Sequence, residues 1–236
     1  MSEKGKLYLI PNTLGDYSPL DVMAPNLGSS LENVSLIFVE KEKVARRLLI
    51  GLGLKEKLQD FRLISIKHGF NASSREVFES TVKSGKDVAI ISDAGCPAVA
   101  DPGYEIVALA HMLRVEVRPK VGPSSIILAL MASGFNGQQF TFHGYLPKEL
   151  GKRRETIKHL ERDAVKNNRT HIFIETPFRN QHLLKDLIQT CEKNTKICLA
   201  VDLTLEDEWI RTASVNDWRA DLPDIHKKQC IFLLHK

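Results

Sequence analysis

The sequence has few cysteines, and it lacks the spacings that usually mark metal or phosphate sites. Its four cysteines form no C-x-x-C pair, and its eight histidines include no H-E-x-x-H. We therefore expect neither a disulfide framework nor a metal site, and interpret Cys191, Cys198 and Cys230 as packing residues. The patterns G-x-G-x-x-G, G-x-x-x-x-G-K-[ST] and G-x-S-x-G are missing, which disfavours Rossmann dinucleotide-binding enzymes, P-loop enzymes and serine hydrolases.

Long apolar runs are also missing. No stretch approaches the roughly 18 apolar residues that span a bilayer, and the run at residues 7–11 is too short for the core of a signal peptide. We therefore expect a cytoplasmic protein with no membrane partner. The net charge of +4 is mildly basic; it permits a nucleic-acid partner but does not by itself indicate one.

Short apolar runs alternate with helical patterns in the first half of the chain. Runs that are almost continuously apolar, with helices between them, predict an α/β domain built on a mostly parallel sheet with helices on both faces. Ligands in such folds bind beyond the carboxyl ends of the strands, so the loops after the strands matter most. The expected strands are 6–10, 34–39, 63–66, 88–91 and 115–118, and the expected helices are 41–49, 74–84 and 104–113.

A glycine-bounded polar turn at residues 133–138 precedes a change of pattern. The second half mixes hairpin-like strands with fewer helices, which favours an α+β domain. We therefore expect an N-terminal domain over 1–134 and a C-terminal domain over 138–236. The expected C-terminal strands are 139–145, 171–175, 196–202, 208–214 and 229–234, with helices at 152–166 and 178–192.

The most informative loop follows the expected strand 88–91. It places Asp93 directly after the strand and Gly95 two residues later, and a glycine without a Cβ lets the backbone approach a ligand closely. We interpret Asp93 as a ligand-binding residue. Asp101 and Pro102 have the sequence of a helix start, so a capping role for Asp101 is the preferred interpretation.

Two further loops repeat this strand-then-helix arrangement. Ser124 and Ser125 open an apolar stretch, where they are either helix caps or part of an anion site built from free N–H groups. Glu175 ends a strand in the second half, where it is either a ligand contact or a solvated charge. Thr176 after it is expected to cap the next helix.

These segments, in this order, resemble the tetrapyrrole methylases, and within them the group that methylates the ribose 2′-hydroxyl of a cytidine in small-subunit ribosomal RNA. The resemblance covers nearly the whole chain, and it is specific only through the combination of its pieces. The family usually has Thr where this chain has Cys96. The matching segments are 7–11, 92–104, 122–124, 132–134, 144–147, 151–154, 174–179 and 202–204.

The resemblance implies a two-domain homodimer that binds S-adenosylmethionine folded in the cleft between its domains, largely through backbone groups. It implies a methyltransferase, with ribosomal RNA as the partner. Carried onto this sequence, the cofactor contacts fall on Ile10, Pro11, Asp93, Gly95, Cys96, Ser124, Ser125, Glu175 and Ala200.

Several segments depart from the pattern of the RNA enzymes. Their Pro-Ile-Gly-Asn-Leu after the first strand is replaced at 11–16, and of their Glu-Asp-Thr-Arg only Glu40 remains. Basic residues of a third motif are replaced by Val201 and Leu205, and residues 227–229 differ as well. The cofactor loops therefore match the family better than the substrate loops do.

A ribose hydroxyl is a weak nucleophile, so a nearby base or hydrogen-bond acceptor would help the reaction. Glu40 after the second expected strand and His68 after the third are the candidates. Their alternatives are a solvated strand end for Glu40 and an ordinary loop histidine for His68.

A basic run at Lys152, Arg153 and Arg154 lies in the first turn of an expected helix, where the helix dipole disfavours cations. The run is either a solvated face or a contact for RNA phosphates. The preferred hypothesis is a ribosomal-RNA ribose methyltransferase or a divergent relative. The alternatives are a methylase of a tetrapyrrole or other small molecule, and a non-catalytic cofactor-binding homologue.

Overall fold

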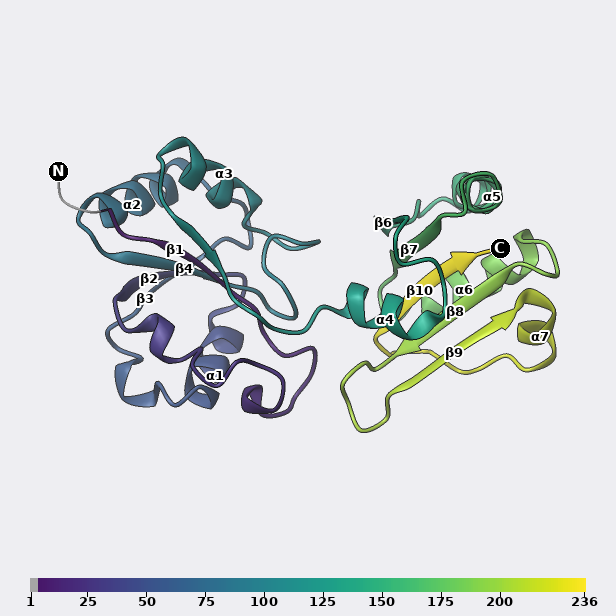
Figure 1. The fold of residues 1–236 in the computed structure, drawn as a ribbon, viewed down its shortest axis with the longest axis horizontal. Coiled ribbons are helices and arrows are strands. Elements are labelled where there is room, and N and C mark those ends of the chain that lie inside the picture. Colours follow the sequence, from purple (N-terminus) through teal and green to yellow (C-terminus); the bar gives the residue numbers. More distant parts are fainter. Residues whose placement is uncertain (1–3) are drawn as a thin grey trace. The chain divides into compact units, whose positions relative to one another are not determined.

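The structure is a computed structural model that describes residues 4–236. The chain folds into two compact units. The first ends at Ser124, and the second begins at Ser125. Each unit has its own five-stranded sheet, with helices packed on it (Figure 1). No helix among the described residues is long and apolar enough to span a membrane.

The sheet of the first unit is entirely parallel. Its strand order is β3-β2-β4-β1-β5, and each neighbouring pair runs in the same direction. All five carboxyl ends therefore lie at one edge, as the sequence predicts. The strands are β1 (Leu7–Ile10), β2 (Val34–Val39), β3 (Arg62–Ser65), β4 (Asp87–Ile91) and β5 (Val117–Pro119).

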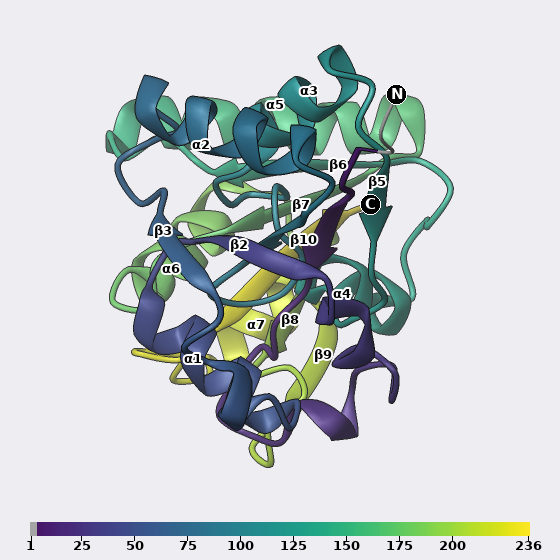
Figure 2. The same ribbon diagram turned by 90° about the vertical axis from the view of Figure 1, so that its left-hand side faces the viewer.

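Helices cover both faces of this sheet (Figure 2). On one face lie α1 (Glu42–Gly51) and the short 3₁₀ segments η1 (Pro19–Asp21), η2 (Ser29–Leu31) and η3 (Lys55–Lys57). On the other lie α2 (Ala72–Lys83) and α3 (Tyr104–Met112). The expected α/β architecture with a mostly parallel sheet is confirmed for this unit.

The second unit has a mixed sheet in the order β6-β7-β10-β8-β9, in which only β6 and β7 are parallel. One face packs against α5 (Leu150–Asn167), α6 (Asn180–Thr190) and α7 (Val215–Ala220), around a core that contains the fully buried Trp218. The strands are β6 (Phe140–Tyr145), β7 (Thr170–Ile174), β8 (Lys196–Val201), β9 (Trp209–Ser214) and β10 (Cys230–His235).

Helix α4 (Ser125–Ser133) packs against β8, β9 and β10 of the second unit. The division of the chain therefore precedes this helix, whereas the sequence suggested a boundary after it, at 134–138. The polar turn that suggested this boundary is tied into the second sheet, because Thr170 Oγ1 donates to the Asn136 carbonyl at 2.8 Å. Asn136 Nδ2 also donates to the Asn168 carbonyl at 2.7 Å.

A row of polar side chains, with His171 buried at its centre, connects α5 with the strands β6 and β7. His143 Nε2 is 2.9 Å from His171 Nδ1, and His171 Nε2 is 3.1 Å from Asp163 Oδ2. Asn167 donates to Asp163 at 2.6 Å, and Arg169 lies 3.4 Å from it. Burial, together with the His143 ring and Arg169, lowers the pKa of His171 to about 4. Burial also lowers the pKa of His143.

The buried His171 in this row of side chains makes the stability of the protein depend on pH. The unfolded histidine keeps its ordinary pKa near 6.5, so the unfolded chain binds more protons than the folded one between about pH 4 and 6.5. We expect the free energy of unfolding to fall as pH falls through this window, by up to roughly 3 kcal/mol from His171. Urea titrations at several pH values measure it, with His171→Leu as the variant whose pH dependence flattens. An equal slope in both proteins would contradict the assignment.

Candidate functional site

The loops after β1 and β4 are joined at the carboxyl edge of the parallel sheet. The Asn12 amide donates to the Gly95 carbonyl at 2.9 Å, and the Gly95 amide donates to the Asn12 carbonyl at 3.1 Å. Asn12 Nδ2 also donates to the Ser92 carbonyl at 3.0 Å, and Ser92 Oγ donates to the Gly95 carbonyl at 2.5 Å. The two loops are therefore held as one rigid structure.

The loop after β5 packs directly on this pair. A Cβ atom at Gly122 would lie 2.3 Å from Pro11 Cγ, so only glycine allows this loop to come so close to the Pro11 ring. The Cys96 thiol donates to the Pro123 carbonyl at 3.6 Å. Three loops that are far apart in the sequence thus form one surface of backbone groups and small side chains.

Asp93 is bound by the loop after β2. Its Oδ1 accepts the Lys41 amide at 3.1 Å, and its Oδ2 lies 2.5 Å from Lys41 Nζ. Lys41 is the N-cap residue of α1, so the Asp93 carboxylate also lies at the positive end of the helix dipole. The hydrogen bond and charge of Asp93 raise the pKa of Lys41. The predicted ligand carboxylate is therefore ordered before any ligand binds.

Asp101 does not cap α3, which corrects the sequence interpretation. The helix begins at Tyr104 with Gly103 as its N-cap residue, because the loop continues through left-handed backbone at Ala98 and Ala100. Among residues 4–236, no hydrogen bond or ion pair reaches the Asp101 carboxylate. Burial, followed by the charges of Glu40 and Asp93, raises the pKa of Asp101 to about 6.

The other predicted residues of the first unit lie at various depths along this edge. Ile10 and Pro11 are buried, whereas Cys96 and Ser124 are half-buried. Burial raises the pKa of the Cys96 thiol. Ser125 is half-buried and belongs to the second unit, as the first residue of α4, where the first N–H groups of a helix lack intrahelical partners.

The two catalytic candidates have different surroundings. Glu40 is half-buried after β2, which lies between β3 and β4, and its charge acts on Asp101. His68 is exposed after β3, the outer strand, and within the described chain no hydrogen bond or ion pair joins it to the loops of β1 and β4. The structure therefore brings Glu40, but not His68, to Asp93 and Asp101.

The predicted residues of the second unit are buried. Glu175 accepts the Thr176 amide at 2.7 Å and pairs with Arg179 at 2.6 Å, so the solvated alternative for Glu175 is wrong. Thr176 is not a cap either, because Arg179 is the N-cap residue of α6. Ala200 is buried in β8, with β10 and β9 on its two sides.

The basic run divides into three different environments. Arg153 is buried: its Nε donates to Asp186 Oδ2 at 2.8 Å, and its Nη1 donates to the Lys148 carbonyl at 2.7 Å. Arg154 is half-buried and donates to Gln189 at 2.6 Å, whereas Lys152 is exposed. The guanidinium of Arg153 is thus used inside the unit, which argues against a phosphate contact at this residue.

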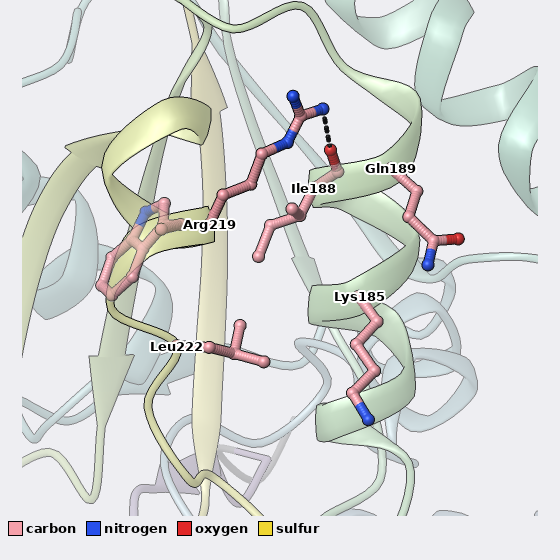
Figure 3. A pocket seen from close by; sticks show the side chains of 6 residues that line it. Lys185, Ile188, Gln189, Arg219 and Leu222 are labelled. Carbon is pink, nitrogen blue, oxygen red and sulfur yellow. Dashed lines mark hydrogen bonds between the residues drawn. The ribbon is translucent and has the colours of Figure 1, made fainter.

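A small pocket of about 150 Å³ lies next to Arg154 and Gln189, between α6 and α7 (Figure 3). Its apolar part comes from Ile188 and Leu222, and Lys185 extends from α6 at its side. Arg219 reaches from α7 and donates to the Ile188 carbonyl at 2.7 Å. Lys185 and Arg219 therefore lie on two helices that this hydrogen bond joins.

The sequence did not indicate roles for Asn12 and Lys41, which join the loops after β1 and β2 to the loop after β4. The only available signal was a carboxylate at a strand end, which calls for a cationic partner. In the part of the chain that the structure describes, no group of three or more His, Cys, Asp or Glu residues is placed to hold a metal ion.

Comparisons with known proteins show the family of the chain. A family model described as "Tetrapyrrole (Corrin/Porphyrin) Methylases" matches residues 21–217. The "Ribosomal RNA small subunit methyltransferase I" of Buchnera aphidicola subsp. Schizaphis graminum is 30% identical over 99% of this chain and 79% of its own length. The protein of the same name from Vibrio cholerae is 30% identical over 97% of this chain and 76% of its own length.

Solved structures show the same fold at lower identity. The uroporphyrin-III-C-methyltransferase of Thermus thermophilus superposes with a TM-score of 0.55 at 18% identity, over 98% of this chain and 92% of its own chain. At this identity the likeness concerns the fold alone.

The environments of Lys152 and Arg153 predict a small and a large effect on stability, respectively. Arg153→Ala leaves Asp186 buried with only the more distant Arg154, at 3.8 Å, as a cation. We expect a loss of about 3–5 kcal/mol in the free energy of unfolding. Lys152→Ala removes only an exposed pair with Glu149 and should change stability by less than about 0.5 kcal/mol. Chemical denaturation measures both, and similar values for the two variants would contradict the buried pairing.

Asp101 predicts a pH effect of opposite sign to that of His171. Its raised pKa means that the folded chain binds more protons than the unfolded chain between about pH 4 and 6, so the ionised carboxylate costs stability above this window. The free energy of unfolding of Asp101→Asn should therefore exceed that of the wild type by roughly 1–2 kcal/mol at pH 8, and should differ little from it at pH 4. A variant that is less stable at pH 8 would show that the carboxylate has a partner.

Proposed function

Because the chain belongs to the tetrapyrrole methylase family, and is a methyltransferase of that family, we propose that it transfers a methyl group from S-adenosylmethionine to a ribose 2′-hydroxyl of small-subunit ribosomal RNA. The observation that carries the proposal is similarity at about 30% identity along nearly the whole chain to proteins named for this RNA. The proposal places the enzyme in the cytoplasm, and the resemblance adds a homodimer.

The residues of the first unit suit the methyl donor. S-adenosylmethionine carries a sulfonium and an ammonium cation, and Asp93, Glu40 and Asp101 place three carboxylates beside a single lysine, Lys41. The joined loops offer backbone groups of Pro11, Gly95 and Cys96 for its polar atoms. When bound there, the donor supplies an electrophilic methyl group.

The chain's own residues then have two tasks. The first is to hold the acceptor oxygen in line with the methyl carbon, and such positioning can supply roughly 7–11 kcal/mol of barrier reduction. The second is to accept a hydrogen bond or a proton from the hydroxyl. Glu40 is the candidate that lies near the cofactor loops. Asp101, which has no ion-pair partner among residues 4–236, is a further acceptor at the same edge.

Binding of the donor is testable by itself. We expect isothermal titration calorimetry to detect S-adenosylmethionine binding to the wild type. Asp93→Ala should weaken it about tenfold, because one charge-assisted contact of this kind contributes about 1.5–3 kcal/mol. Asp60→Ala, an exposed carboxylate of the same unit, is the matched control and should bind as the wild type does. Absence of any binding would remove the proposed methyl donor.

The acceptor needs a separate measurement. Purified enzyme should methylate 30S subunits from a strain that lacks this gene, and mapping of methylated riboses should find a modification that is missing in that strain. Donor binding without such a modification would leave a methyltransferase with another acceptor.

A further inference from the structure

A second pocket of the first unit lies beside the joined loops. Its volume is about 320 Å³, which is within the range of small-ligand sites. Asn12 belongs both to the loop junction, through its bonds to Gly95, and to the wall of this pocket. The remaining walls come from the chain after β1, from η1 and from the second half of α1 (Figure 1).

The pocket is rigid because η1 and α1 are in direct contact. A Cβ atom at Gly51 would lie 2.7 Å from Pro19 Cγ, so the helix cannot carry a larger residue here. Tyr17 is held as well, since its hydroxyl accepts the Leu14 amide at 3.2 Å. Thr13 Oγ1 donates to the Gly15 carbonyl at 2.7 Å. The walls are therefore formed before a ligand arrives.

The chemistry of the walls changes from one side to the other. Leu48, Ile50 and Pro19 form an apolar side, and the buried Asn12 and Thr13 form a polar one. Asp16 and Arg47 form an ion pair of 2.9 Å at the outside, with side chains that are 84% and 59% exposed. A flat ring with polar edges and a nearby anionic group would match all of these surfaces.

We propose that this pocket receives the unstacked base of one nucleotide of the RNA acceptor, with the base against Tyr17 and a phosphate on Arg47. The inference rests on the proposed function. Sequence-specific proteins bind RNA mostly through bases that leave the stack and lie on aromatic side chains. Arg47 presents an exposed guanidinium to the phosphate, and the Asp16 carboxylate accepts N–H groups from the base edge.

The position of the pocket supports an acceptor rather than the donor. The pocket lies on the α1 side of the Asn12–Gly95 junction, whereas Cys96 and Pro123 are bonded to each other on the side of the β5 loop. None of the residues assigned to the donor lines the pocket, and Asn12 connects the pocket with the joined loops. A nucleotide held in the pocket would be positioned by the same backbone bonds that position the donor loops.

Helix α1 offers a matched pair of variants. Arg46 and Arg47 are neighbours, both exposed and each in one ion pair, but only Arg47 lines the pocket. We expect Arg47→Ala to weaken binding of a short single-stranded uridine oligomer and of 30S subunits from the deletion strain, and to reduce the salt slope of binding by about one. Arg46→Ala should bind both RNAs within twofold of the wild type.

The Tyr17 ring is tested in the same assays. Tyr17→Leu should weaken binding of both RNAs by about tenfold, as expected for a lost base stack. Tyr17→Phe keeps the ring and should stay within twofold, which separates stacking from the loss of the hydroxyl. Donor binding, measured by calorimetry, should be unchanged in all four variants.

The outcomes separate this inference from the proposed function. If the wild type methylates 30S subunits but Arg47→Ala and Arg46→Ala bind RNA alike, the pocket assignment is wrong and the function stands. If Arg47→Ala weakens S-adenosylmethionine binding instead, the pocket belongs to the donor and the assignment is again wrong. If the Arg47 and Tyr17 effects occur on the oligomer while 30S subunits are not methylated, the pocket stands and ribosomal RNA is not the substrate.

Discussion

Two backbone hydrogen bonds between Asn12 and Gly95 hold the rest of the site in place. Parallel strands are joined by long crossover connections, so the loops after β1 and β4 are far apart along the chain, and no local sequence pattern predicts their contact. The β-bridge between them fixes both loops, and Gly122 against Pro11 adds the loop after β5. Every assignment in the first unit, from donor contacts to the pocket beside Tyr17, depends on this junction.

Charge is distributed around the junction in an uneven way. The ammonium group of Lys41 compensates the charge of Asp93, but Asp101 has no ion-pair partner among the described residues. Burial, followed by the charges of Glu40 and Asp93, raises the pKa of Asp101. Uncompensated carboxylates cost stability in a folded protein, and they are typical of sites that bind cations or transfer protons. A sulfonium donor fits such a site. The histidine pair under α5 is a contrasting case, because its polar groups are directed at one another inside the unit.

The sequence predicted the strands, the sheet type and the edge that carries the loops, because buried parallel strands leave a clear apolar pattern. It failed where local patterns were ambiguous. Asp101-Pro102 has the pattern of a helix start, yet left-handed backbone at Ala98 and Ala100 delays the helix to Tyr104. Arg153 was interpreted as a surface cation, yet its side chain is buried and forms an ion pair with Asp186, which is distant in sequence. Lys41 and Asn12 could not be found because strand order, which makes β2 and β1 neighbours of β4, is not written in any local pattern.

Hydrogen exchange of the backbone amides, with and without S-adenosylmethionine, measures directly whether the joined loops form the donor site. We expect added donor to slow exchange in residues 92–96 and 120–124, next to the Asn12–Gly95 bridge, and to leave exchange in α2 unchanged. Donor that binds without protecting either loop, and that slows exchange elsewhere instead, would contradict it.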